Sequence, residues 1–193
     1  MAGTDDLCTI YFVRHGETDW NVQGRTQGHT DIPLNSNGEV QAHELREKLQ
    51  DIKFDAVFSS DMQRAKKTAD IISLERDIAV QSTKLLRERN FGVLEGKTKD
   101  EIQVIINNLL FKLTEEEKRT ARLFPEQEND EEVVSRIVTF LREIAIANPG
   151  KTILIVSHGG IIRELLIHFI FNGVGEKYNL KISNGAYIKF ESD

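Results

Sequence analysis

The chain is poor in several residue types that mark particular protein classes. It contains a single cysteine, Cys8, which excludes an intramolecular disulfide framework and favours a reducing, cytoplasmic location. It has only three prolines in 193 residues, and no run rich in Ser and Gly or in one charge sign indicates a linker or tail. The acidic residues 1–6 do not have the pattern of a secretory signal. We therefore expect one domain over residues 1–193.

Long apolar runs and excess positive charge are also missing. The longest apolar segments, Thr152 to Val156 and Ile161 to Ile170, are far shorter than the ~20 residues of a membrane-spanning helix. Lys and Arg number 25 against 31 Asp and Glu, which gives a net charge of -6. Nucleic acids and anionic membranes are bound by basic faces, so neither is expected as a partner. An anionic substrate would need a local basic pocket.

The residues that are present indicate alternating strands and helices. Strands are predicted at Cys8 to Val13, Ala56 to Phe58 and Thr152 to Val156, with a weaker edge strand at Ala186 to Phe190. Apolar residues recur at helical spacing in four segments: 42–49, 62–74, 134–144 and 161–171. This alternation predicts an α/β fold, a three-layer α/β/α sandwich with a mainly parallel mixed sheet. The polar stretch at about 97–130 is interpreted as a helical excursion over the sheet end.

Two of the predicted strands end in the same way. His15-Gly16 follows one strand, and His158-Gly159-Gly160 follows another. In an open α/β sheet, ligands bind beyond the carboxyl ends of the strands, so both histidines should face one crevice. The glycines allow a close approach of backbone N–H groups to an anion, and Gly159 would begin a helix whose N-terminus attracts phosphate.

Two arginines are expected at the same edge. Arg14 precedes His15, and Arg64 opens a helix after the strand ending at Ser59-Ser60. A guanidinium group stays charged and can engage two phosphate oxygens together. The residues alone therefore predict an anion site that contains histidine.

Four blocks of the sequence resemble the signature of the histidine phosphatase, or phosphoglycerate mutase-like, superfamily, and they occur in the family order. They are Arg14 to Asn21, Ser59 to Ala69, Leu86 to Gly96 and Ser157 to Gly160. Together they span nearly the whole chain. The resemblance implies the phosphoglycerate mutase-like fold and a histidine acid-phosphatase-type phosphomonoesterase that uses neither a metal nor a cofactor.

The resemblance also implies roles for individual residues. His15 would be the nucleophile that forms a phosphohistidine, while Arg14, Arg64 and His158 would hold the phosphoryl oxygens. Glu88 matches the acid/base position, where it would protonate the leaving group and then accept a proton from water. Substrate contacts are implied for four further residues: Asn21, Gln27, Gly28 and Gly159. The expected partners are a small phosphorylated metabolite and inorganic phosphate as product.

Within the family, the main alternative is a 2,3-bisphosphoglycerate-dependent phosphoglycerate mutase. The segments Phe91 to Thr98 and Gln27 to Leu34 resemble the phosphatase branch, whereas Lys99 falls at the register of a mutase lysine that contacts substrate. Broad-specificity, sugar-phosphate and phosphoglycerate phosphatases all fit the segment Leu86 to Gly96. Within Pro125 to Asn129 the chain keeps Glu128 in register, whereas Gln127 and Asn129 are not the usual family residues, so the substrate is left open.

Two other classes are weighed against this interpretation. A metal hydrolase would need closely spaced His or Asp ligands, which the sequence lacks, and the two arginines would repel a divalent cation. A catalytically silent phospho-ligand-binding member would be expected to lack catalytic residues that are all present here. Residues outside the motifs, including His29, His43 and His168, are predicted to be structural or exposed, and Trp20 to be a packing residue. A homodimer is compatible with the sequence, which contains no recognisable interface.

Overall fold

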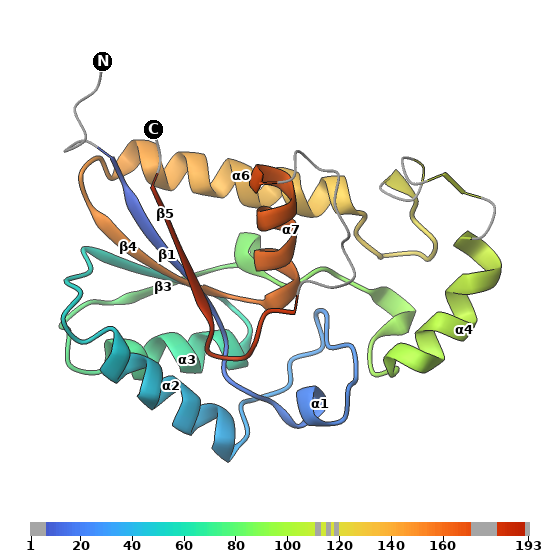
Figure 1. Cartoon of the computed structure of the whole chain (residues 1–193), viewed down its shortest axis with the longest axis horizontal. Helices are drawn as coiled ribbons and strands as arrows, with labels where there is room; N and C mark the ends of the chain where they lie inside the picture. Colours follow the sequence, from blue (N-terminus) through green and yellow to red (C-terminus); the bar gives the residue numbers. More distant parts are fainter. Residues whose placement is uncertain (1–6, 111–112, 115–116, 118–119, 171–180, 192–193) are drawn as a thin grey trace.

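The computed structural model describes residues 7–110, 113–114, 117, 120–170 and 181–191 (Figure 1). Its centre is a five-stranded sheet with the order β3-β2-β4-β1-β5. The strands are β1 (Thr9–Arg14), β2 (Ala56–Ser60), β3 (Val80–Thr83), β4 (Thr152–Ser157) and β5 (Tyr187–Glu191). Only β5 runs antiparallel to its neighbour, so the prediction of a mainly parallel mixed sheet is confirmed. Strand β3 was not predicted.

The strands β1 and β4 lie side by side in the middle of the sheet because both are apolar on both faces. Ile10 and Phe12 of β1 point into one core, whereas Val13 points into the other. In β4, Ile153 alternates with Leu154 in the same manner. Burial on both faces is what the continuous apolar runs predicted.

Helices cover both faces of this sheet and make the three layers (Figure 1). Helices α6 (Asp130–Ala147) and α7 (Gly159–Ile170) pack on one face through Ile137, Phe140 and Ile161. Helices α2 (Ser36–Lys48) and α3 (Gln63–Ser73) pack on the other face through Leu45 and Ala69. All four helices were predicted from their periodicity, and Phe171, the last residue of the fourth predicted segment, lies outside the described residues.

The remaining helical elements lie in the connections after β1 and β3. They are α1 (Asp19–Val22), the 3₁₀ turns η2 (Lys84–Leu86) and η3 (Gly92–Leu94), and α4 (Lys99–Leu110). Figure 1 shows α4 apart from the sheet, on the same side as α1. Helix α4 begins the predicted excursion at 97–130, of which residues 111–112, 115–116 and 118–119 lie outside the described part. Among the described residues, no helix is both long and apolar enough to cross a membrane.

The unusual residues at 127–129 have a structural explanation. Asn129 caps α6: its side chain accepts the Glu132 N–H at 2.9 Å, and the Glu132 carboxylate accepts the Asn129 N–H at 2.9 Å. Gln127 accepts the Leu123 N–H at 3.2 Å through its side chain. Reciprocal capping of this kind fixes where a helix begins. Asn129 therefore stabilises the start of α6, and Gln127 stabilises the segment before it.

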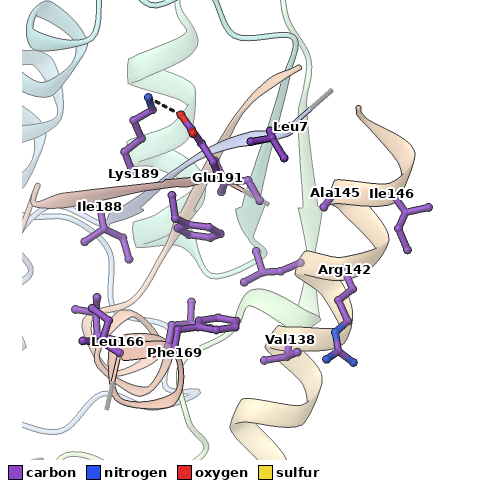
Figure 2. Close-up of a pocket in the computed structure, with 15 residues that line it drawn as sticks. Leu7, Val138, Arg142, Ala145, Ile146, Leu166, Phe169, Ile188, Lys189 and Glu191 are labelled. Carbon is purple, nitrogen blue, oxygen red and sulfur yellow. Dashed lines mark ion pairs between the residues drawn. The ribbon is translucent and has the colours of Figure 1, made fainter. Parts of the chain in front are cut away.

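An apolar groove of about 680 Å³ lies between α6, α7 and β5 (Figure 2). Val138 and Phe169 line it from the two helices, and Ile188 lines it from the strand. It also contacts Leu7, which precedes β1, and Glu191, which pairs with the first residue of β1. The groove is therefore at the end of β1 opposite to His15 and takes no part in the site described below.

Candidate active site

The two histidines at the strand ends lie next to each other. Strands β1 and β4 are parallel neighbours with Arg14 opposite Ser157, so His15 and His158 follow in register. The His15 N–H donates to the Ser157 carbonyl at 3.0 Å, and the two imidazole centroids are 5.2 Å apart. The exposed fractions are 3% for His15 and 0% for His158. The structure thus places both rings in one buried cluster, as the sequence predicted.

The hydrogen bond of His15 defines its tautomer. Its Nδ1 atom lies 2.6 Å from the Gly16 carbonyl oxygen. A carbonyl can only accept, so Nδ1 carries the proton and the neutral ring keeps a lone pair on Nε2. A nucleophilic histidine needs this arrangement, because the lone pair must be available to attack.

Arg14 is held beside the histidines by the start of α7 and by the chain before β5. Its guanidinium donates to the Ile182 carbonyl. A Cβ atom on Gly159 would lie only 2.9 Å from the Arg14 Nε, so a glycine is needed where the helix begins against this side chain. The Arg14 Nε is buried without a hydrogen-bond partner among the described residues. The predicted Gly159 therefore makes room for the Arg14 side chain.

Arg64 is fully buried near the second position of α3. Its two terminal nitrogens donate to the Thr30 carbonyl at 3.0 Å and to the Gly28 carbonyl at 2.8 Å. Burial is the main cause that lowers its pKa to about 10, so the guanidinium stays charged at neutral pH. Its Nε has no partner within the described part of the chain. The predicted Gly28 thus positions Arg64, and its φ of +53° is one that glycine favours.

Glu88 lies at the same cluster because two backbone N–H groups hold its carboxylate. Its Oε2 accepts the Gly160 N–H at 3.0 Å, and its Oε1 accepts the Arg89 N–H at 2.9 Å. A Cβ atom on Gly160 would lie 2.4 Å from Oε1, so the second glycine of the motif permits this approach. Burial lowers the pKa of Arg14, and the nearby charge of Glu88 opposes that shift. The five predicted catalytic residues are therefore brought together.

The main chain of Glu88 accepts hydrogen bonds from two side chains that were not predicted as site residues. The Glu88 carbonyl accepts from His29 Nε2 at 3.0 Å and from Arg136 Nη2 at 3.2 Å. Arg136 is itself held by Glu128 through Nε at 2.8 Å. His29 was predicted to be structural or exposed, and the structure gives it a structural contact with the main chain of Glu88. No motif marks these residues, since their role depends on the packing of α6 on the loop that carries Glu88.

The predicted substrate contacts Asn21 and Gln27 differ in their hydrogen bonds to residues of the site. The Asn21 Oδ1 accepts the Thr18 N–H at 3.1 Å in the cap of α1 and is also bound by Asn184. Gln27 is buried, and among the described residues its Oε1 has no hydrogen-bond partner. No hydrogen bond joins the Gln27 side chain to His15 within the described part. Trp20 packs against Gly96, where a Cβ atom would lie 3.2 Å from the ring.

Both histidines are held in the neutral form. Burial is the largest cause that lowers the pKa of His15 well below 6.5, and the charges of Arg64 and Arg14 add to it. Burial and the charge of Arg64 likewise lower the pKa of His158. Neither ring nitrogen of His158 has a hydrogen-bond partner among the described residues. A neutral His15 can act as a nucleophile at neutral pH without first losing a proton.

These shifts predict how stability depends on pH. The unfolded chain takes up protons on His15 and His158 as the pH falls below 6.5, whereas the folded chain does not. The free energy of unfolding should therefore fall below pH 6.5 by at most about 1.4 kcal/mol per pH unit for each ring. Urea titrations at pH 7.5, 6.5 and 5.5 measure this slope. His158→Gln should reduce it, and the exposed His43→Gln should not; equal slopes in all three proteins would contradict the prediction.

The described residues contain no group of three or more His, Cys, Asp or Glu side chains arranged to hold a metal ion. The positive charges near His15 are the guanidinium groups of Arg14 and Arg64, which attract anions, and the Glu88 carboxyl group lies close to both. The arrangement can bind a phosphoryl group next to a histidine lone pair and a carboxyl group.

Comparisons with known proteins agree with this geometry. A model of the family described as "Histidine phosphatase superfamily (branch 1)" matches residues 10–193. The uncharacterized phosphatase PhoE of Bacillus subtilis is 35% identical over 189 residues, which cover 96% of this chain and 89% of that protein.

Solved structures show the same fold. YhfR of Bacillus stearothermophilus superposes with a TM-score of 0.83 at 29% identity, covering 96% of this chain and 92% of that one. Phosphoserine phosphatase of Entamoeba histolytica, solved with 3-phosphoglyceric acid, has a TM-score of 0.82 at 28% identity and covers 95% of this chain and 90% of that one. With the family match over nearly its full length and the paired histidines in place, the chain belongs to the histidine phosphatase superfamily.

Proposed function

We propose that the protein hydrolyses small phosphomonoesters through a phosphohistidine on Nε2 of His15. The observation that carries this proposal is the hydrogen bond from His15 Nδ1 to the Gly16 carbonyl, which leaves the Nε2 lone pair available. This lone pair belongs to a ring whose pKa is lowered by burial and by Arg64 and Arg14. Family membership and the relatives named phosphatases support the same activity.

In the first step, Nε2 of His15 attacks phosphorus and the P–O bond to the ester oxygen breaks. The protonated Glu88 carboxyl gives its proton to the leaving oxygen, so that an alcohol departs. The guanidinium groups of Arg14 and Arg64 donate hydrogen bonds to the phosphoryl oxygens, and the neutral His158 donates to one of these oxygens. Charge stabilisation of this kind is the main contribution of proteins to phosphoryl transfer.

In the second step, water attacks the phosphorus of the phosphohistidine and the P–N bond breaks. The Glu88 carboxylate takes the proton of the water, inorganic phosphate leaves, and His15 returns to its neutral form. One carboxyl group thus serves both steps in turn. The hydrogen bonds from the N–H groups of Gly160 and Arg89 keep this carboxyl at the reacting end of the sheet throughout.

The proposed substrates are small phosphorylated metabolites, including sugar phosphates, phosphoglycerates and phosphoamino acids. The Entamoeba relative is named a phosphoserine phosphatase and was solved with 3-phosphoglyceric acid, which supports this size class. The buried Gln27 Oε1, which has no hydrogen-bond partner among the described residues, offers an acceptor for a hydroxyl or ammonium group of such an ester.

The decisive assay measures phosphate release from a panel of esters in buffer containing EDTA, alongside the isomerisation of 2-phosphoglycerate to 3-phosphoglycerate. The panel contains 3-phosphoglycerate, 2,3-bisphosphoglycerate, fructose bisphosphates, phosphoserine and p-nitrophenyl phosphate. We expect rapid release that EDTA does not reduce, with little isomerisation. Loss of activity on chelation would establish a metal hydrolase instead.

The same assay separates the phosphatase from the mutase. Lys99, which falls at the register of a mutase lysine, is exposed at the first position of α4. Rapid isomerisation that requires 2,3-bisphosphoglycerate, with slow phosphate release, would contradict the proposed function. Tight phosphate binding without any turnover would assign the protein to the phospho-ligand-binding class.

A further inference from the structure

One side chain outside the predicted motifs touches two residues of the site. Asn184 lies in the connection that enters β5, and its Nδ2 donates to the His15 carbonyl at 3.1 Å. The same nitrogen donates to Oδ1 of Asn21 at 3.1 Å. One amide group from the C-terminal part of the chain therefore joins the main chain of the nucleophile to the side chain of a predicted substrate contact.

These contacts determine which end of the Asn21 amide is available to a ligand. The Asn21 Oδ1 accepts the Thr18 N–H at 3.1 Å and lies 3.2 Å from the Thr18 hydroxyl, in addition to Asn184. With several donors on its oxygen, the amide presents its Nδ2 group on the other side. An NH₂ group is a donor and suits a phosphoryl oxygen, whereas the reversed amide would present an oxygen and repel it.

The chain around Asn184 is itself fixed to the site. The Ile182 carbonyl accepts from the Arg14 guanidinium, and the Ala186 carbonyl accepts the Arg14 N–H at 2.9 Å. Strand β5 then continues as the antiparallel partner of β1. Residues 181–186 thus contact Arg14, His15 and Asn21. Among the described residues, Asn184 is the one member of this segment that hydrogen-bonds to them through its side chain.

We propose that Asn184 is a positioning residue that holds the Asn21 amide with its NH₂ group toward the bound phosphoryl group. This inference rests on the proposed function, because it takes Asn21 to contact the substrate. Asn184 itself does not touch the substrate. It acts through Asn21 by removing the alternative amide orientation, so that the NH₂ donor keeps its position beside the nucleophile.

The test is a double-mutant cycle on phosphate binding. Asn184→Ala, Asn21→Ala and the double variant are compared with the wild type by calorimetric titration with inorganic phosphate and by the KM for p-nitrophenyl phosphate. Loss of one oriented hydrogen bond should raise Kd and KM about 3- to 10-fold in each single variant. The double variant should be no weaker than Asn21→Ala alone, because Asn184 acts through Asn21.

The matched control is Asn37→Ala. Asn37 donates from its side chain to the Glu17 carboxylate at 3.0 Å, near the same loop but without contact to the site, and its removal should leave Kd and KM unchanged. Effects that simply add in the double variant, or wild-type phosphate affinity in a folded Asn184→Ala, would overturn the proposal. If Asn184→Ala does not fold, Asn184→Leu keeps the volume without the donor.

The binding measurement separates this proposal from the proposed function. If the wild type releases no phosphate from any ester yet binds phosphate with the expected coupling between Asn21 and Asn184, the positioning role stands and the proposed function fails. If the wild type hydrolyses esters and the coupling is absent, the proposed function stands and the positioning role fails.

Discussion

Replacing His15 with alanine is expected to reduce phosphate release by at least ~10³-fold, the order of loss seen when an enzyme loses its nucleophile. The Nε2 lone pair is removed, and water alone must then attack the ester. Rapid quenching after mixing with a ³²P-labelled ester should give an acid-labile, alkali-stable label in the wild type and none in His15→Ala.

The control for this variant is His43→Ala, since His43 is exposed on α2. It should hydrolyse esters at the wild-type rate. His15→Ala should remain folded, because a neutral ring with one protein hydrogen bond is lost and no charge is left unpaired. Wild-type turnover by a folded His15→Ala would show that the nucleophile has been assigned wrongly.

Replacing Glu88 with glutamine should give an effect that depends on the leaving group. Glutamine keeps an oxygen for the Gly160 N–H but cannot transfer a proton. For an alkyl phosphate the rate should fall about 10²- to 10⁴-fold, the usual contribution of general acid catalysis. For p-nitrophenyl phosphate, whose leaving group needs no proton, the first step should stay fast while the attack of water becomes slow.

The measurement that separates the two steps is the release of p-nitrophenol in the first turnover. Glu88→Gln should show a burst of about one equivalent followed by a slow steady rate, and no burst with an alkyl phosphate. Glu131→Gln, on the exposed first turn of α6, serves as the matched control with wild-type kinetics. An equal loss for both esters without a burst would argue against an acid/base role.

The central strands and the residues that follow them could be predicted because short, continuous segments of the sequence determine them. The apolar runs before His15 and His158 are long enough to indicate strands buried on both faces. A single residue, Arg14 or Ser157, separates each run from a His-Gly pair. Since the carboxyl ends of parallel strands meet at one edge, two such strands place their next residues together. Arg64 and Glu88 were identified through the motifs around them.

Other features depend on contacts that no local pattern records. Strand β3 contains Val80-Gln81-Ser82-Thr83, a short and mostly polar edge segment that pairs with β2 only on one side. Asn184 reaches His15 across 169 positions of sequence, and Arg136 reaches Glu88 across 48. In the sequence alone, Asn184 and Arg136 cannot be distinguished from exposed polar residues, because their contacts form only when the sheet and α6 pack.

The central place of β1 has a consequence for how the protein is made. Among the described strands, β1 is synthesised first and pairs with β4 and β5, which are synthesised last. A nascent chain that has not reached residue 152 therefore carries His15 directly after a strand whose two neighbours in the sheet have not yet been made. Phosphate affinity should arise only after β5 has been synthesised, so ribosome-bound chains that stop before β5 should not bind phosphate.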